Sequence, residues 1–166
     1  MDLGISERVK PLINDISQYI EDHIVPNERV YAQQVEEGGR WTETAVMEEV
    51  KEKAKARGLW NFFLPESERG AGLTNIDYAH IAEILGRYPM SSEAMNCAAP
   101  DTGNMEVIER YGTEEQKEQW LKPLLSGEIR SAFAMTEPFV ASSDATQISL
   151  DARLDGDEWV LNGEKW

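Results

Sequence analysis

Apolar residues recur at helical spacing through most of the first 130 positions of the chain. Residues three, four and seven positions apart share one face of a helix, so such a series predicts an amphipathic helix that is buried along that face. Pro26 interrupts the first series and suits the first turn of a second helix, where a missing amide hydrogen costs nothing. The members of that first series are Val9, Leu12, Ile13, Ile16, Ile20 and Ile24.

Start and stop signals delimit the later helices. Residues 44–57 favour a helix, and Gly58 follows where a left-handed C-cap is expected. Residues 74–77 and 113–116 each have the spacing of a capping box, in which the first and fourth residues cap each other's amides. The second of these boxes leads into an apolar series that Gly127 ends.

Two further stretches complete the predicted helical part. Residues 91–111 are expected to be helical around a break at Pro100, and residues 65–72 form a polar loop. An apolar and aromatic cluster lies before that loop, and we expect it to be buried. Its members are Leu59, Trp60, Phe62, Phe63 and Leu64.

The hydrophobic period changes from helical to two after Gly127. Residues 129–136 alternate in a manner that predicts a strand buried on both faces. Glu137-Pro138 is expected to end this strand, because proline has no amide hydrogen to give to a ladder.

The last part of the chain predicts a short antiparallel meander. Residues 148–154 alternate strictly, and Asp155-Gly156 is a typical two-residue hairpin turn before a returning strand at 159–161. Asn162-Gly163 predicts a second hairpin turn, followed by one more strand at 164–166.

Together these patterns predict a mainly α chain. An N-terminal helical bundle, residues 1–127, is followed by the first antiparallel strands of a β-barrel-like middle domain, residues 128–166. A hairpin is marginally stable alone, and an apolar strand edge left open promotes aggregation. We therefore expect this chain to be the N-terminal piece of a larger protein.

Composition excludes several functions. The 166 residues include 16 Lys and Arg against 31 Asp and Glu, which gives a net charge of −15. This charge argues against nucleic-acid binding and against a polybasic membrane anchor. We expect no membrane span and no signal peptide, because no apolar run is long enough. Cys97 is the single cysteine and is expected to be a small buried hydrophobe in a cytoplasmic protein.

Familiar metal and nucleotide motifs are missing from the sequence. His23 and His80 lie outside the Glu-x-x-His spacing of di-iron bundles, so no metal site is predicted. Residues 70–72 contain two of the glycines of a dinucleotide fingerprint, but the third is replaced by Asn75. No phosphate loop and no nucleophile elbow is present, and we assign no catalytic residue to this chain.

The segment 133–146 remains as candidate chemistry. It is an extended run that enters a loop dense in small and hydroxyl side chains. Small side chains let a ligand approach the backbone, and hydroxyls and free amides can bond to its polar edge. A tight turn capped by its own Ser and Asp side chains explains the same residues, and physical reasoning alone favours that alternative.

Four motifs resemble those of the acyl-CoA dehydrogenases and together cover nearly the whole chain. Residues 134–138, followed by 141–146, are similar to the flavin-loop signature of this family. Residues 162–166 resemble its next motif, and residues 100–105 and 111–117 resemble motifs that precede the β domain. The variant Ser-Ser-Asp-Ala-Thr is similar to a subgroup associated with longer or less usual acyl chains.

The resemblance implies FAD as the cofactor and assigns its contacts to a few residues. Phe133, Met135 and Thr136 would lie beside the isoalloxazine ring, with the threonine hydroxyl near its N5 edge. Ser143 matches the serine that touches acyl-CoA or flavin, and its neighbour Ser142 is the second candidate. The loop is one residue longer than the common pattern here, so the choice between the two serines stays open. Residues 96–104 would line the acyl cavity, although core packing explains them equally well.

The activity implied by the resemblance is α,β-dehydrogenation of an acyl-CoA thioester, with electrons passed to a partner flavoprotein. The glutamate base of the family lies in a C-terminal domain, so the 166-residue chain is expected to be inactive by itself and homo-oligomeric when part of the full-length protein. A non-catalytic helical scaffold and an acyl-CoA oxidase or nitroalkane-oxidising relative are the alternatives.

Overall fold

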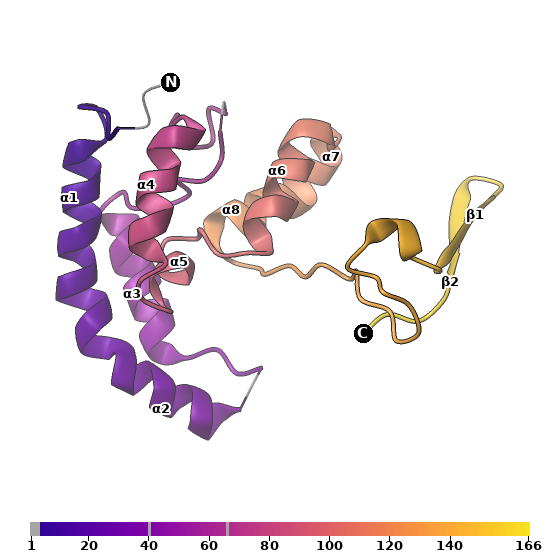
Figure 1. Ribbon diagram of the computed structural model, residues 1–166, viewed down its shortest axis with the longest axis horizontal. Coiled ribbons are helices and arrows are strands. Elements are labelled where there is room, and N and C mark those ends of the chain that lie inside the picture. Colours follow the sequence, from indigo (N-terminus) through magenta and orange to yellow (C-terminus); the bar gives the residue numbers. More distant parts are fainter. Residues whose placement is uncertain (1–3, 40, 66) are drawn as a thin grey trace. The chain divides into compact units, whose positions relative to one another are not determined.

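The computed structural model of the protein describes residues 4–39, 41–65 and 67–166 (Figure 1). The chain divides into two compact units, Met1–Ser131 and Ala132–Trp166. The first, the helical unit, contains all the α-helices of the described residues, and the second, the hairpin unit, contains both strands. The mainly α fold class predicted above is therefore confirmed.

The helical unit begins with a long amphipathic stretch. Helix α1 (Lys10–Tyr19) runs into a π-helical turn, η1 (Ile20–Ile24), and a short 3₁₀ turn, η2 (Val25–Asn27), leads to α2 (Glu28–Gly38). In Figure 1 the chain changes direction between α1 and α2, at the turn that contains Pro26. The predicted apolar stripe is confirmed, since four of its members are buried and two are partly buried. The buried members are Val9, Ile16, Ile20 and Ile24, and the partly buried ones are Leu12 and Ile13.

Local capping signals fix the next two helices. Helix α3 (Ala45–Ala56) starts after Thr44, and Gly58 follows its end with a φ of +76°, in the left-handed region that glycine adopts without a steric cost. Helix α4 (Asn75–Leu85) starts at a complete capping box, in which the Thr74 hydroxyl accepts from the Asp77 amide. Both predictions are confirmed.

The predicted helix over 91–111 is interrupted for longer than the sequence pattern indicates. Helix α5 (Ser91–Ala94) has a single turn, and α6 (Asp101–Tyr111) starts only after Pro100. The chain leaves the helical conformation at Asn96, whose φ is +53°. The side chain of Asn96 compensates for this conformation with buried hydrogen bonds, which are described below.

The second capping box also forms as predicted. Helix α7 (Glu114–Gln116) starts directly after its N-cap Thr113. It continues through a π-helical turn, η3 (Lys117–Leu121), into α8 (Lys122–Ser126). Gly127 ends α8 with a φ of +78°.

One hydrophobic core joins the helices of this unit. The apolar cluster before the 65–72 loop is part of it, as predicted, although Trp60 is only half-buried; its indole N–H donates to the Leu125 carbonyl at 2.7 Å. In the described residues no helix is both long and apolar enough to cross a membrane. The largest fully buried side chains are Tyr19, Ile16, Ile20, Ile24, Leu59, Leu64, Ile81, Leu85, Met90, Met95, Met105 and Leu121.

The hairpin unit contains one antiparallel pair of strands. Strand β1 (Asp151–Asp155) pairs with β2 (Glu158–Asn162), and Asp155 lies opposite Glu158 across a two-residue turn. Gly156 in that turn has a φ of +61°, as this type of turn requires. The predicted first hairpin is confirmed. A 3₁₀ turn, η4 (Ala145–Gln147), precedes it.

Two predicted strands do not form. Residues 129–136 belong to no ladder in the described structure, and Phe133 is 69% exposed rather than buried. Instead of a strand partner, the Met135 amide donates to the carbonyl of Phe133 at 3.0 Å. After Asn162-Gly163 the chain bends without making a second hairpin, and the Trp166 amide donates to the Thr136 carbonyl at 2.9 Å. The prediction of a buried strand is therefore wrong here, because a strand requires a neighbouring strand to pair with.

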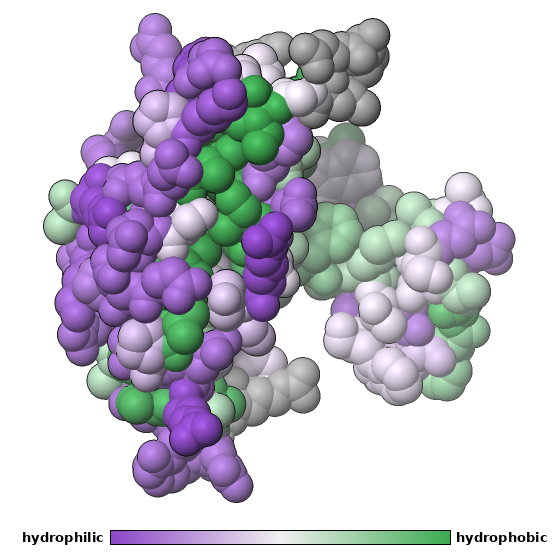
Figure 2. Space-filling model, turned by 60° about the vertical axis from the view of Figure 1, so that its left-hand side comes forward, coloured by the Kyte–Doolittle hydropathy of each residue, from purple (hydrophilic) through white to green (hydrophobic). Residues whose placement is uncertain are grey.

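Both strands of the hairpin are exposed along their whole length. Figure 2 shows apolar side chains at the surface of the hairpin unit, whereas polar side chains cover most of the visible face of the helical unit. The most exposed large apolar residues of the hairpin unit are Phe133, Phe139, Leu154, Trp159, Leu161 and Trp166.

Candidate functional site

The residues predicted to contact a cofactor lie along the segment 133–136 and the loop that follows it. Thr136 is exposed, and neither its amide nor its hydroxyl donates a hydrogen bond to any of the described residues. Phe133 is exposed beside it, and Met135 is half-buried. This stretch therefore offers the amide and hydroxyl of Thr136, together with one aromatic face, to a ligand.

A buried carboxylate fixes the loop directly after this segment. Glu137 is 5% exposed, and its two carboxylate oxygens accept four hydrogen bonds. One oxygen accepts from the Ser149 amide at 2.8 Å and from the Ser149 hydroxyl at 2.6 Å. The other accepts from the Leu150 amide at 3.0 Å and from the Lys165 ammonium at 2.9 Å. Glu137 thus joins three separate parts of the hairpin unit.

These contacts favour the charged form of the carboxyl group. The Ser149 hydroxyl, followed by the Lys165 ammonium and the backbone amides, lowers the pKa of Glu137 from 4.5 to about 2. Hydrogen bonds that are made only to the ionised form lower a carboxyl pKa in this way. Glu137 is therefore a fixed negative charge throughout the physiological pH range.

The structure separates the two candidate serines. Ser142 is buried, and its hydroxyl oxygen accepts from the Glu137 amide at 2.8 Å, so it helps to close the loop. Ser143 is exposed and makes no side-chain hydrogen bond with the described residues. Of the pair, Ser143 is the one whose hydroxyl is accessible to a ligand. Asp144 caps the 3₁₀ turn that follows, with its carboxylate accepting from the Thr146 amide at 3.0 Å and hydroxyl at 2.7 Å.

Sequence reasoning missed the residues that hold this loop. The sequence pattern identifies Glu137 only as the end of a strand, and it indicates no structural role for Lys165 or Ser149. The signal available was an acid next to a proline in a segment without a basic residue, because such an acid, once buried, needs donors from elsewhere in the chain. The donors lie 12, 13 and 28 positions away in the chain, so no local pattern could identify them.

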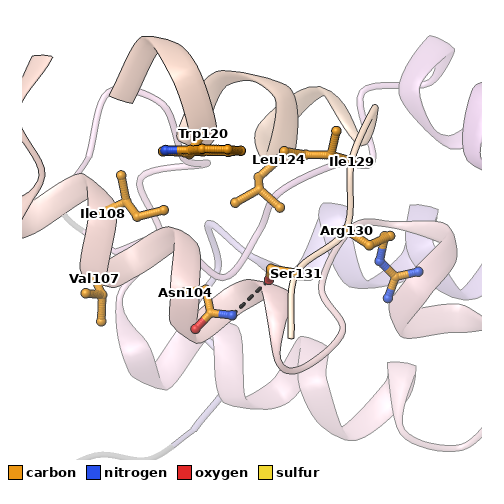
Figure 3. Close-up of a pocket in the computed structure, with 8 residues that line it drawn as sticks. All are labelled: Asn104, Val107, Ile108, Trp120, Leu124, Ile129, Arg130 and Ser131. Atoms are coloured by element: carbon orange, nitrogen blue, oxygen red, sulfur yellow. Dashed lines mark hydrogen bonds between the residues drawn. The ribbon is translucent and has the colours of Figure 1, made fainter. Parts of the chain in front are cut away.

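A second feature is an apolar groove on the helical unit (Figure 3). It encloses about 410 Å³ between α6, the π-helical turn before α8 and the chain after Gly127. Asn104 lies at its polar end and donates to the Ser131 hydroxyl at 2.8 Å. The volume falls within the range typical of small-molecule pockets. The other lining residues are Val107, Ile108, Trp120, Leu124, Ile129 and Arg130.

Charged groups fix the chain beside this groove. The buried Asp101 carboxylate accepts from the Ser131 amide and hydroxyl, both at 2.6 Å, and from the Arg130 guanidinium at 2.5 Å. Arg130 also pairs with Glu93 at 2.6 Å, and Glu93 pairs with the buried Lys51 at 3.2 Å. The end of the helical unit is thereby held against α5 and α6.

Residues 96–104, the predicted lining of an acyl cavity, are divided between core and surface. Asn96 is a core residue, because its amide donates to the Asn61 side chain at 2.7 Å and to the Leu124 carbonyl at 3.0 Å. Gly103 is exposed on α6, and a Cβ atom placed there would meet nothing within 4 Å. Asn104 lines the groove of Figure 3.

The remaining reactive side chains lie outside these sites. Burial raises the pKa of the Cys97 thiol to about 11, so the thiol stays protonated and is a poor nucleophile. The ring of His23 packs against that of Tyr19, with the centroids 4.8 Å apart. Within the described ranges, no three His, Cys, Asp or Glu side chains come together in a way that could hold a metal ion.

Comparison with known proteins identifies a family. Residues 6–128 match the family model "Acyl-CoA dehydrogenase, N-terminal domain". Acyl-CoA dehydrogenase family member 10 of Mus musculus is 50% identical over 168 aligned positions, which cover 98% of this chain and 16% of the mouse protein. The chain thus spans about one sixth of that relative.

Two solved structures share the fold. A Mycobacterium abscessus protein assigned as an acyl-CoA dehydrogenase is 46% identical and superposes with a TM-score of 0.89, over 98% of this chain and 42% of that protein. An acyl-CoA dehydrogenase of Bacillus anthracis, solved in complex with FAD, is 28% identical with a TM-score of 0.64, over 97% of this chain and 26% of that protein. The chain belongs to the acyl-CoA dehydrogenase family.

Proposed function

We propose that this chain is the N-terminal part of an FAD-dependent enzyme that dehydrogenates an acyl-CoA thioester between its α and β carbons. The observation that carries the proposal is the free amide and hydroxyl of Thr136, which are presented on an exposed segment beside Phe133. The FAD complex of the Bacillus anthracis relative supports the choice of cofactor.

The residues present fit the polar edge of a flavin. The Thr136 amide and hydroxyl would donate hydrogen bonds to it, and the Phe133 ring and the Met135 side chain would pack against its apolar face. Ser143 would contact the cofactor or the acyl-CoA through its accessible hydroxyl, whereas Ser142 would act indirectly, by closing the loop. Bound FAD would supply the hydride acceptor of the reaction.

The other half of the reaction requires groups that we assign to the rest of the full-length protein. Removal of the α-proton needs a general base near the thioester. We assign no such base to this chain, so the 166 residues alone are proposed to be inactive. A second flavoprotein as electron acceptor and homo-oligomerisation of the full-length protein remain predictions.

The test is anaerobic mixing of the full-length protein, loaded with FAD, with a series of acyl-CoA thioesters. Bleaching of the flavin absorbance together with formation of the 2-enoyl-CoA supports the proposal. No bleaching with any thioester contradicts it. Production of peroxide at each turnover in air would instead indicate an acyl-CoA oxidase.

Replacing Thr136 by valine in that protein is expected to lower FAD occupancy or the rate of flavin reduction by about tenfold, because valine has the same shape but no hydroxyl to donate. Thr136→Ser keeps the hydroxyl and is the matched control, expected to behave nearly as the wild type. Absorbance measures the FAD occupancy, and stopped-flow mixing measures the rate of flavin reduction. Wild-type values in Thr136→Val would remove the role assigned to this hydroxyl.

Gly103 offers a test of the proposed acyl cavity. Gly103→Ala is expected to raise the free energy of unfolding by up to about 1 kcal/mol, because alanine favours a helix and its methyl group meets open space. Gly103→Leu is expected to keep that stability but to shift the preference of the full-length enzyme toward shorter acyl chains. Urea unfolding and kcat/KM across chain lengths measure the two effects. An unchanged chain-length profile would show that Gly103 does not line the cavity.

A further inference from the structure

The peptide unit between Met135 and Thr136 is bonded on one side only. Its carbonyl oxygen accepts from the Lys165 ammonium at 3.1 Å. In a trans peptide the carbonyl and the amide hydrogen point in opposite directions. Lys165 therefore lies on the side away from the Thr136 amide hydrogen, which has no acceptor among the described residues.

The next peptide unit is bonded on both sides. The Thr136 carbonyl accepts from the Trp166 amide at 2.9 Å, and the Glu137 amide donates to the Ser142 hydroxyl oxygen at 2.8 Å. Thr136 belongs to no helix or strand, yet the peptides before and after it are both tethered. Its free amide and hydroxyl are thus presented from a fixed backbone.

The ammonium group of Lys165 is itself held in place. It pairs at 2.9 Å with the carboxylate of Glu137, a side chain that is only 3% exposed. A cation that bonds to a carbonyl oxygen polarises the whole peptide unit, and hydrogen bonds along such a chain strengthen one another. The Thr136 amide opposite Lys165 is thereby made a stronger donor.

We propose that Lys165 is a positioning residue, which orients the Thr136 amide toward the flavin edge and raises its strength as a donor. This inference rests on the proposed function and adds to it a residue that touches neither cofactor nor substrate. Because a reduced flavin carries more negative charge than an oxidised one, the stronger donor would favour reduction.

The experiment compares Lys165→Met with Lys165→Arg in the full-length holoprotein. Methionine has a similar length without the charge, and arginine keeps the charge. We expect Lys165→Met to bind FAD about tenfold more weakly, because the Thr136 amide would no longer be held toward the flavin and its hydrogen bond would be largely lost. The flavin bound to Lys165→Met should have a more negative midpoint potential and a shifted absorption maximum. In Lys165→Arg the potential and the absorption maximum should both be close to the wild-type values. Lys51→Met, which removes a buried lysine that is also paired with carboxylates, should leave the flavin potential and spectrum unchanged.

Several results would overturn the inference. One is a Lys165→Met protein with wild-type FAD affinity and potential. Another is weaker FAD binding and a lower melting temperature with an unchanged potential and spectrum, which would show that Lys165 only stabilises the loop. If either of these results is found while the wild-type protein binds FAD and reacts with acyl-CoA, the role of Lys165 is refuted but the proposed function is not. A wild-type protein that binds no FAD would overturn both.

Discussion

Replacing Asn96 by alanine is expected to lower the free energy of unfolding of the protein by about 2–4 kcal/mol. Asn96 is buried, has a φ of +53°, and donates to the Asn61 side chain and to the Leu124 carbonyl. Alanine would leave the Asn61 side-chain oxygen without its donor and would remove one of the two donors of the Leu124 carbonyl, which also accepts from the Gly127 amide. It would also retain the strain of a left-handed backbone without the side chain that compensates for it. Urea unfolding followed by tryptophan fluorescence and circular dichroism measures the loss.

Asn96→Gly separates the two contributions. Glycine loses the same hydrogen bonds but adopts a positive φ freely, so it should cost less than alanine. Equal costs would show that backbone strain contributes nothing at this position. Wild-type stability in both variants would refute the description of Asn96 as a core residue.

Glu137→Gln is expected to loosen the loop that carries Thr136 and to remove most of the bound FAD from the full-length protein. Glutamine has nearly the same shape, but it loses the charge that pairs with Lys165 and replaces one acceptor oxygen by a donor. Hydrogen exchange at the Ser149 and Leu150 amides, which donate to this carboxylate, reports the change directly. We expect exchange to be at least about tenfold faster in the variant at neutral pH.

The pH dependence of this difference has a definite sign. The pKa of Glu137 is lowered from 4.5 to about 2 in the folded protein, so its contribution to stability is complete above pH 4.5 and is lost as the pH falls toward 2. The exchange rates of wild type and Glu137→Gln should therefore converge across that window. A constant difference down to pH 2 would show that the charge of Glu137 is not what holds the loop.

The helices could be predicted because their signals are local. The capping boxes at Thr74 and Thr113 and the glycine stops at Gly58 and Gly127 each act within four or five residues, and all four form. The sequence pattern predicts a shorter break before α6 than the structure has. The hydrogen bonds that stabilise the backbone of Asn96 join its side chain to acceptors 28 and 35 positions away, which no local pattern specifies.

The strands and the candidate site show the limit of the same reasoning. Alternation around Phe133 indicates an extended backbone, but burial of such a segment depends on neighbours that the pattern does not specify. The segment itself could be recognised from its motif. The different environments of Ser142 and Ser143 could not, because the contact that turns Ser142 inward is made with the backbone of Glu137.

The visible absorption spectrum of the purified full-length protein tests the central claim most directly. If the segment around Thr136 helps to hold a flavin, the protein will be yellow, with the visible absorption bands of a flavin, and will release about one FAD per chain. A colourless protein that takes up no FAD when it is supplied would contradict the account and would leave a helical scaffold as the explanation of this chain.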